Sequence, residues 1–463
     1  MSNNSFHFDV SERKVLLRIF DIGSVLFLLH FVGNIINLDY FIISARHWFW
    51  SIVLAFYLTV FGTIFELYNL QKASNFVIVF KNVLITSSIT VLFYLFTPYF
   101  TPSLPSNRLQ IIYFFLAMTV ALLVWRYAYI VFISTPKFYK KVLLVAPGGQ
   151  VDGIVASLQK SDPNYKVVNY FDISEQECAV YNSQGIQALN FVDFSLMAED
   201  SAISEIIVCT FASEGIPMQL NSRLVKLLEK GKVVRDYAQV YEELTQRIHI
   251  QQVSGDFYRY FPFGRNNRNK LYLFLSEVMD LVLCILGLGF GIVLLPFLLI
   301  GNAIGNRGSL MFTQTRVGRN GKHFRLYKLR SMGKNAEANG FQFAVSGDIR
   351  ATKFGRFLRK SRLDEVPQFL NVLKGEMSVI GPRPERPEFV EELVENLPFY
   401  EVRHLVRPGI TGWAQVNAKY GSSQEDSLEK LQYDFYYIKH RSLFLDMEII
   451  IKTLSTIIFF RGQ

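Results

Sequence analysis

Four long apolar stretches follow one another in the first third of the chain, at residues 19–36, 49–65, 76–96 and 111–133. Each approaches the roughly 20 residues that a helix needs to cross the hydrocarbon layer of a membrane. Tryptophan and tyrosine side chains lie near the proposed ends, which is typical of anchors at the membrane interface. The pattern predicts a membrane α-helical bundle of four spans over residues 1–136.

Ionisable residues in this region bear on the role and orientation of the bundle. Asp21, Lys81 and Arg126 fall inside or near the spans, and we favour pairing between helices or snorkelling over a transport pathway as their role. Lysine and arginine are in excess before the first span, around the second turn and after the fourth span. Because cytoplasmic loops carry this excess, we expect both ends of the bundle in the cytoplasm.

Residues 137–255 show a different pattern, in which short β-branched apolar runs alternate with helix-like segments. This alternation predicts a Rossmann-like cytoplasmic α/β domain with a parallel sheet. The loop after the first expected strand reads PGGQVDG and not GxGxxG. We therefore expect no tight binding of NAD or FAD by this domain and favour a structural or oligomerising role.

A fifth apolar run covers residues 281–300 and has basic residues on both sides. Positive charge on both flanks is expected of a segment that leaves and re-enters the same membrane face. Pro296 lacks an amide hydrogen and clashes with the preceding turn, so it can break the helix. We predict a re-entrant membrane helical hairpin over residues 270–304, broken at Pro296; the alternative is an ordinary span kinked by the proline.

Composition agrees with a membrane protein that has a cationic face. Of the 463 residues, 50% are hydrophobic and 19% charged, and 48 Lys and Arg against 39 Asp and Glu give a net charge of +9. A soluble chain of this length is rarely so apolar, because large cores stop growing. The three cysteines are far apart in the sequence, which argues against a disulfide scaffold or a cysteine-rich zinc site.

The positive charge is concentrated directly after the fifth apolar run. Residues 307–362 contain fourteen Lys and Arg residues and only two acidic residues. The cations alternate with apolar residues in RVGRNGKHFRLYKLRSM, a pattern that predicts a folded hairpin with its turn at Gly318 to Gly321. Lipid headgroups explain part of this charge. Folded Arg and Lys side chains also recognise phosphate, Arg as a bidentate fork and Lys as a point charge.

An acidic pair follows the basic stretch. Asp364 and Glu365 lie between two segments of helical periodicity, where such a pair often serves only as a helix cap. Arginines and lysines surround the pair, so a nucleophile or metal site in a cationic phosphate cradle is the competing interpretation. The later segment GPRPERP, residues 381–387, predicts a rigid turn that presents Arg383 and Arg386.

Three long motifs carry a family resemblance: FTQTRVGRNGKHFRLYKLRSM, LRKSRLDEVPQFLNVLKGEMSVIGPRPE and RHLVRPGITGWAQVN. In this order and spacing they resemble the bacterial sugar transferase family of monotopic-type polyprenyl-phosphate phosphoglycosyl transferases. With four spans and a Rossmann-like domain upstream, the whole chain is similar to the large branch, which includes undecaprenyl-phosphate glucose and galactose phosphotransferases. The resemblance implies an α/β catalytic phosphoglycosyl transferase domain over residues 305–463.

The resemblance also implies a reaction. Family enzymes transfer a hexose-1-phosphate from a nucleotide diphosphate sugar, here UDP-glucose or UDP-galactose, to undecaprenyl phosphate and release UMP. This is the first membrane step of exopolysaccharide, capsule or O-antigen synthesis. By match to the family, Asp364 attacks phosphorus to form a phosphosugar-aspartyl intermediate, and Glu365 holds Mg2+. Arg359 and Arg383 match phosphate-site arginines, and Lys328 and Arg330 match the basic KLR motif.

Small departures and one further cluster qualify the match. Glu376 stands where the family often has Asp, and Leu295 precedes Pro296 where many small members have Ser. Arg403, His404 and Arg407 form another basic cluster, for which we favour a structural or interface role for the histidine over general-base catalysis.

The expected partners are undecaprenyl phosphate, a nucleotide diphosphate sugar and the lipid bilayer, with no nucleic acid, and a homodimer is a candidate assembly. The expected location is the bacterial cytoplasmic (inner) membrane, with the catalytic domain on the cytoplasmic face. Two other functions compete. One is a membrane-bound glycosyltransferase that releases UDP, and the other is a non-enzymatic polysaccharide-export scaffold. The sequence names neither the sugar nor the oligomeric state.

Overall fold

The computed structural model describes residues 10–36, 40, 47–73, 76–132, 139–162, 165–173, 186–209, 216–250, 269–306, 308–333, 350–418, 421 and 423–458. The chain divides into two compact units, Met1–Thr245 and Gln246–Gln463. Each unit is built around its own hydrophobic cores.

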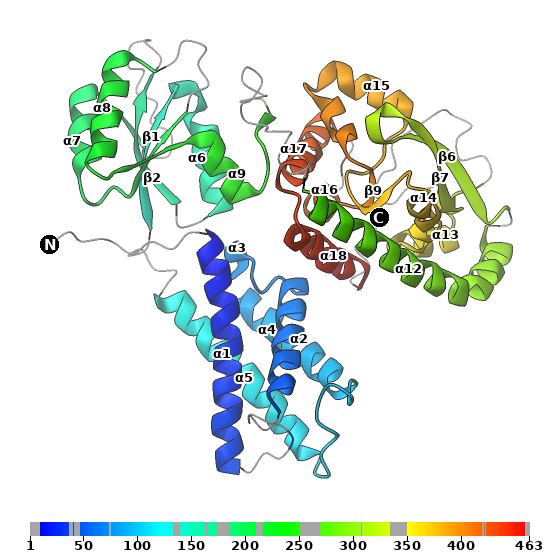
Figure 1. Ribbon diagram of the computed structural model, residues 1–463. Helices are drawn as coiled ribbons and strands as arrows, with labels where there is room; N and C mark the ends of the chain where they lie inside the picture. Colours follow the sequence, from blue (N-terminus) through cyan, green and yellow to red (C-terminus); the bar gives the residue numbers. More distant parts are fainter. Residues whose placement is uncertain are drawn as a thin grey trace. The chain divides into compact units, whose positions relative to one another are not determined.

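The first unit begins with a helical bundle (Figure 1), made of α1 (Val10–Ile36), α2 (Trp48–Ile64), the short α3 (Leu70–Ala73), α4 (Phe76–Leu95) and α5 (Leu109–Phe132). The four predicted spans are therefore confirmed as apolar helices. α1, α4 and α5 are long and apolar enough to cross a membrane, whereas α2 is shorter, with 17 residues. Their facing sides share one core, and apolar side chains on their outer sides stay exposed for lipid.

An ion pair joins the first and last helices of the bundle. Arg126 donates from Nε to Asp21 Oδ1 at 3.0 Å and from Nη2 to Asp21 Oδ2 at 2.5 Å. A third bond runs from its Nη1 to the carbonyl of Leu67 at 2.9 Å. Both charged side chains are fully buried. Of the two favoured roles, pairing between helices and snorkelling, these two residues therefore show pairing between helices.

The second part of this unit is a five-stranded parallel sheet of order β3-β2-β1-β4-β5. The strands are β1 (Lys140–Ala146), β2 (Tyr165–Asp172), β3 (Gln187–Leu189), β4 (Glu205–Val208) and β5 (Val233–Asp236). One face is covered by α6 (Val151–Ser161) and α9 (Tyr237–Thr245), and the other by α7 (Phe191–Glu199) and α8 (Met218–Glu229) (Figure 1). Alternate residues of β1 enter the two cores. The parallel α/β sheet is thus present, and its Rossmann-like character stays a prediction.

The loop after β1 is closed by a carboxylate of the domain itself. In the 3-10 turn Gly148–Gln150, the amide of Gly148 donates to Asp172 Oδ1 at 3.0 Å. A Cβ atom at Gly148 would lie 2.5 Å from Asp172 Oδ2, so this close approach requires glycine. In dinucleotide-binding domains the corresponding loop faces the pyrophosphate.

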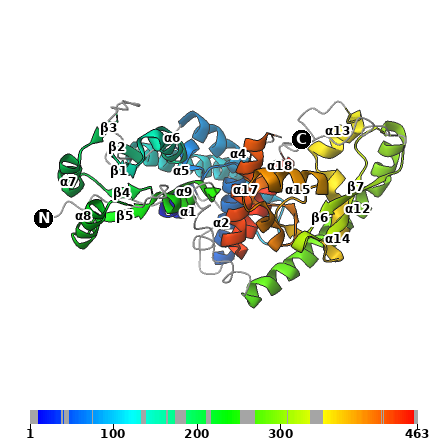
Figure 2. The same ribbon diagram turned by 90° about the horizontal axis from the view of Figure 1, so that it is seen from above.

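The second unit combines α12 (Lys270–Gly305) with two small sheets and, among its described residues, eight further helices and helical turns besides the hairpin turn. Figure 2 shows α12 and the hairpin strands of this unit. The hairpin of β6 (Met311–Val317) and β7 (His323–Leu329) turns at Arg319–Gly321, as predicted. The parallel pair β8 (Ser378–Ile380) and β9 (Gly409–Thr411) forms the other sheet. The remaining helices and turns are α13 (Lys353–Lys360), η6 (Leu363–Gln368), α14 (Phe369–Leu373), α15 (Pro387–Asn396), η7 (Tyr400–Leu405), α16 (Trp413–Asn417), α17 (Gln424–His440) and α18 (Leu443–Ile458).

The sequence pattern assigns residues 246–250 to the middle domain, but they pack with the second unit. Ile248 and Ile250 are buried in its core. The amide of Ile248 donates to the carbonyl of Gln432 at 3.2 Å, and Trp413 Nε1 donates to the carbonyl of Gln246 at 3.2 Å. Only tertiary contacts reveal this, because the segment carries no local boundary signal.

α12 corrects the expected break at Pro296. The structure shows one helix of 36 residues that contains Pro296, not two helices separated there. Its ribbon changes direction in the last part (Figure 1), as expected where a proline removes one helical hydrogen bond. The helix is long and apolar enough to cross a membrane. Re-entry to the same face stays a prediction.

Glycines give α12 a side that fits closely against the segment that follows the acidic pair. A Cβ atom at Gly287 would lie 2.3 Å from the ring of Phe369, and one at Gly291 would lie 2.7 Å from Val366. Asp280, on the same helix, accepts from Ser378 Oγ at 3.0 Å and from the Val379 amide at 2.9 Å. The apolar helix is therefore fixed to the elements that carry the acidic pair.

Candidate functional site

The acidic pair lies in the 3-10 turn η6, between α13 and α14. Arg362 starts this turn with a φ of 55°, in the left-handed region that non-glycine residues rarely adopt. Asp364 and Glu365 follow and are 8% and 7% exposed. Strained backbone that presents two nearly buried carboxylates is typical of a functional site and is more than a helix cap requires.

Three cations surround the Glu365 carboxylate. Arg383 Nη1 lies 3.1 Å from Oε1, Arg362 Nη1 lies 3.2 Å from Oε2, and Lys328 Nζ lies 3.9 Å from Oε1. Burial alone would raise the pKa of Glu365, but these three charges outweigh it and hold that pKa at about 2. Glu365 is therefore ionised at neutral pH.

Asp364 has a different environment. Within the described part of the chain, neither of its carboxylate oxygens has a hydrogen bond or an ion pair at contact distance. Burial, together with the negative charge of Glu365, raises its pKa to about 6, although Lys328, Arg359 and Arg383 act in the opposite direction. A carboxylate that is free of close partners and near cations is available to act as a nucleophile.

β7 supplies the lysine of the site. The side chain of Asn371, in α14, accepts from the Tyr327 amide at 3.1 Å and donates to the Arg325 carbonyl at 2.7 Å. These bonds fix β7 beside the segment of the acidic pair. Burial, reinforced by the neighbouring Arg383, lowers the pKa of Lys328 to about 8.

The turn at residues 381–387 supplies Arg383, as the sequence predicts. β8 leads into it, and β9 lies beside it: the Gly381 amide donates to the Thr411 carbonyl and the Gly409 amide to the Pro382 carbonyl, both at 2.9 Å. A Cβ atom at Gly409 would lie 2.1 Å from the Gly381 nitrogen. The glycines of GPRP and RPGITG are therefore needed for close backbone packing.

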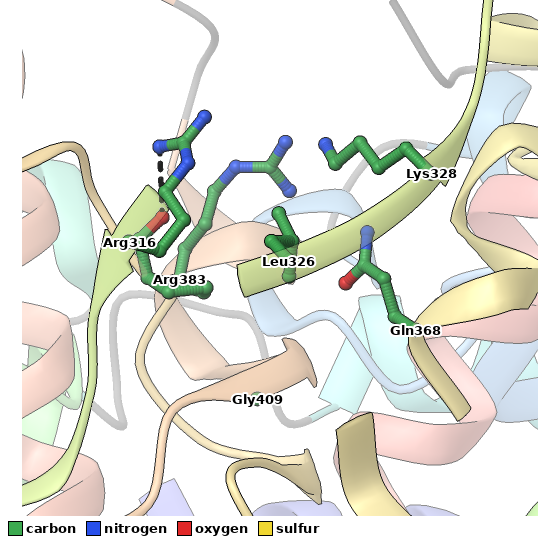
Figure 3. Close-up of a pocket in the computed structure, with 7 residues that line it drawn as sticks. Arg316, Leu326, Lys328, Gln368, Arg383 and Gly409 are labelled. Carbon is green, nitrogen blue, oxygen red and sulfur yellow. Dashed lines mark hydrogen bonds between the residues drawn. The ribbon is translucent and has the colours of Figure 1, made fainter. Parts of the chain in front are cut away.

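A small hollow, partly open to solvent, is lined by Lys328 and Arg383, both of which contact Glu365. Figure 3 shows the nitrogen-bearing ends of Arg316, Lys328 and Arg383 on the same side of this hollow. Gln368 and Gly409 also line it (Figure 3). Arg316 and Gln368 lie within the family motifs but are not among the site residues predicted from the sequence.

The remaining predicted site residues fall into two groups. Arg359 lies within electrostatic range of Asp364 and donates from Nε to Ser331 Oγ at 3.0 Å. Arg330 instead donates from Nη2 to Ser309 Oγ at 2.7 Å, near the end of α12. Thus the structure brings Lys328, Arg359 and Arg383 to the acidic pair, whereas Arg330 has no contact with it among the described residues.

His404 is not placed for general-base catalysis. Burial, with the charge of Arg403 beside it, lowers the pKa of its imidazole to about 4. The ring makes an edge contact with Tyr400, with centroids 6.2 Å apart. Arg407 points elsewhere and contacts Glu277 Oε1 at 3.2 Å. These contacts favour the structural interpretation of the cluster.

Comparison with known proteins agrees with the geometry. A family model described as Bacterial sugar transferase matches residues 271–460. The galactosyl transferase CpsE of Streptococcus agalactiae is 30% identical over 325 residues, which cover 65% of this chain and 68% of that protein. The chain belongs to the bacterial sugar transferase family.

Two further relatives match about half or less of the chain. A UDP-N-acetylgalactosamine-undecaprenyl-phosphate N-acetylgalactosaminephosphotransferase of Aeromonas hydrophila is 42% identical over 220 residues, 48% of this chain and 51% of that protein. A UDP-glucose:undecaprenyl-phosphate glucose-1-phosphate transferase of Xanthomonas campestris is 37% identical over 193 residues, 41% of this chain and 40% of that protein. The chain thus spans about half or less of the length of these two curated relatives.

Proposed function

We propose that this protein transfers a sugar-1-phosphate from a UDP-sugar to undecaprenyl phosphate and releases UMP. The observation that carries the proposal is that Asp364, free of close partners among the described residues, lies next to Glu365 and its fixed cations, beside a membrane-length helix. Family relatives named as undecaprenyl-phosphate sugar phosphotransferases support the reaction class.

The reaction takes two displacements at one phosphorus atom. First, an Asp364 oxygen attacks the sugar-bearing phosphorus, the bond to the bridging oxygen breaks, and UMP leaves with that oxygen. Next, an oxygen of undecaprenyl phosphate attacks the same phosphorus and displaces Asp364, which regenerates the carboxylate. A covalent nucleophile divides one difficult transfer into two easier ones. Arg383, Lys328 and Arg359 stabilise the charge on the phosphoryl oxygens in both steps.

Mg2+ fits the donor chemistry of the acidic pair. Hard carboxylate oxygens suit this ion, which proteins usually hold through one or two carboxylates together with substrate phosphates. Glu365 would hold it, and the bound ion would neutralise the diphosphate of the donor. Because cations already contact both Glu365 oxygens, one of these side chains must move aside for the metal.

The sugar is expected to be glucose, galactose or N-acetylgalactosamine. The first two follow from the resemblance to the large branch, and the third from the name of the Aeromonas relative. We place the protein in the bacterial inner membrane with its catalytic domain on the cytoplasmic side, because nucleotide sugars are cytoplasmic. A homodimer stays a prediction.

A donor screen tests the proposal. Purified protein is incubated with Mg2+, undecaprenyl phosphate and one of the three labelled UDP-sugars, and the lipid and nucleotide products are then separated. We expect label in the lipid fraction and an equal amount of UMP with one donor. Release of UDP would identify a glycosyltransferase instead, and the absence of lipid product with all three donors would contradict the proposal.

A further inference from the structure

The turn that carries Arg383 is held mainly through its carbonyl groups. Prolines occupy positions 382, 384 and 387, and proline has no amide hydrogen to donate. Four consecutive carbonyls of the turn each accept a bond from outside it: Pro382 from the Gly409 amide at 2.9 Å, Arg383 from Arg403 Nη2 at 2.9 Å, Pro384 from Arg316 Nη1 at 3.0 Å, and Glu385 from the Val317 amide at 3.0 Å.

The bond from Arg403 differs from the other three because it holds the residue that reaches the acidic pair. Arg383 precedes a proline, which restricts its backbone to extended conformations. Its carbonyl accepts from Arg403, and its side chain contacts Glu365 Oε1 at 3.1 Å. The orientation of the Arg383 backbone therefore determines where its side chain places the guanidinium group relative to Glu365.

Arg403 is built to hold a fixed position. It lies in η7 and is 7% exposed, and it is not among the side chains that line the hollow. Its Nη2 also contacts Asp434 Oδ2, from α17, at 2.9 Å, and its Nη1 donates to the Tyr400 hydroxyl. A planar guanidinium can hold three such partners at once, whereas a lysine ammonium lacks the fork geometry.

We propose that Arg403, oriented by Asp434, is a positioning residue that fixes Arg383 for phosphosugar transfer. It acts through the Arg383 backbone and does not touch substrate. The inference rests on the proposed function and deepens it by assigning a role to a buried ion pair outside the phosphate site.

A double-mutant cycle tests this inference on the full-length protein. The variants are Arg403→Lys, Arg383→Ala and the two combined, and the readout is kcat/KM for UMP release with the best of the three UDP-sugars. We expect Arg403→Lys alone to lower kcat/KM by about 10- to 100-fold, because a displacement of about 1 Å at a reacting centre can have that effect. In the Arg383→Ala background the same change should alter kcat/KM by less than about twofold.

Two controls separate positioning from folding. Arg247→Lys changes another arginine of this unit, one that pairs with Glu429 at 2.8 Å, and should leave kcat/KM unchanged. Asp434→Asn, which keeps the shape of the carboxylate, should show a smaller loss that also disappears without Arg383. If Arg403→Lys does not fold, Asp434→Asn takes its place in the double-mutant cycle.

Each outcome has a distinct meaning. Equal losses from Arg403→Lys in both backgrounds would show a merely structural role and overturn the positioning inference alone, as would no loss in the wild-type background. If Arg383→Ala by itself leaves kcat/KM unchanged, the phosphate role of Arg383 in the proposed function fails instead.

Discussion

At the scale of single residues, Asp364 and Glu365 are neighbours in the chain but have unlike surroundings. Glu365 contacts three cations, and its pKa is held at about 2; Asp364 has no such contact among the described residues, and its pKa is raised to about 6 by burial and by Glu365. Two adjacent carboxylates can therefore take different roles. The sequence predicts the pair and its cationic surroundings, whereas the contacts show that Glu365, and not Asp364, is paired with cations among the described residues.

The nucleophile assignment leads to a direct test at Asp364. Asp364→Asn keeps the shape of the side chain, but a neutral amide cannot accept the phosphoryl group, so UMP release should fall by at least about a thousandfold. The exposed Glu388 on α15 offers a matched control, since Glu388→Gln also removes one negative charge from this unit. Activity near the wild-type level in folded Asp364→Asn would eliminate the aspartyl intermediate.

His404 predicts a pH dependence of stability. Its folded-state pKa of about 4 lies below its ordinary value of 6.5, so between these values the unfolded chain binds a proton that the folded protein does not. The free energy of unfolding should therefore decrease as the pH falls from about 6.5 to about 4. Thermal unfolding midpoints measured across this range should fall less in His404→Gln than in the wild type.

Some acid sensitivity should remain in the His404→Gln variant, because burial also lowers the pKa of His249 to about 4. The informative quantity is the difference between the two proteins at each pH. If their midpoints fall in parallel, His404 does not titrate as its burial implies.

At the scale of elements, α12 is both a membrane-length helix and a support for the acidic pair. Gly291 and Gly287 lie close to Val366 and Phe369, one and four residues after Glu365, and Asp280 bonds to β8. Glycine weakens an isolated helix, but at these two positions it lets other side chains approach α12 closely.

Two neighbouring glycines of α12 provide a matched pair of variants. Gly287→Ala places a methyl group within 2.3 Å of the Phe369 ring, whereas Gly289→Ala meets no atom within 4 Å. Overpacking at Gly287 should lower the free energy of unfolding by about 1–3 kcal/mol and reduce UMP release by shifting the acidic pair. Gly289→Ala should be neutral or slightly stabilising, since alanine favours a helix.

The readouts for both glycine variants are the thermal midpoint in detergent and the rate of UMP release. Equal behaviour of the two variants would mean that α12 does not support the acidic pair through this contact. A loss of activity in Gly289→Ala alone would indicate that the opposite side of the helix matters more.

At the scale of the whole molecule, the catalytic motifs all lie in the unit Gln246–Gln463. The family model covers residues 271–460 of the same part. Residues 246–250 complete the core of that unit through Ile248 and Ile250. The motifs therefore leave out a segment that forms part of the core of this unit.

Truncation tests this boundary. A fragment of residues 246–463 should keep UMP release, because it contains the whole core and all proposed site residues. A fragment of residues 270–463 lacks the buried Ile248 and Ile250. By analogy with large-to-small changes in protein cores, the loss of each isoleucine should lower the free energy of unfolding by about 2–5 kcal/mol. We expect the shorter fragment to have a lower thermal midpoint; equal midpoints would show that 246–250 is dispensable.

Topology gives the last prediction. In a background without the natural cysteines, Lys270→Cys and Ser309→Cys, both at exposed positions near the ends of α12, should be labelled from the cytoplasmic side by an impermeant thiol reagent. Both ends must face the cytoplasm if the acidic pair is to meet a cytoplasmic nucleotide sugar. Tyr99→Cys, in the loop between α4 and α5, should be labelled only from outside. Labelling of positions 270 and 309 from opposite sides would show that α12 crosses the membrane completely.

The sequence by itself determined the features that depend on local hydrophobic length, periodicity and charge. Apolar length predicted the helices of the bundle, alternation predicted the parallel sheet, and the motifs predicted the acidic pair with Lys328 and Arg383. These inferences succeed because hydrophobic length, periodicity and charge are local quantities.

Only the tertiary structure decided which distant side chains meet. In the structure, Arg316 and Gln368 line the hollow, Arg330 bonds to Ser309, and α12 continues through Pro296. Arg403 also links Asp434 to the carbonyl of Arg383. Such contacts join residues 20 to 70 positions apart and depend on how close backbones can approach, as at Gly381 and Gly409. Packing sets that distance, and no local pattern in the sequence encodes it.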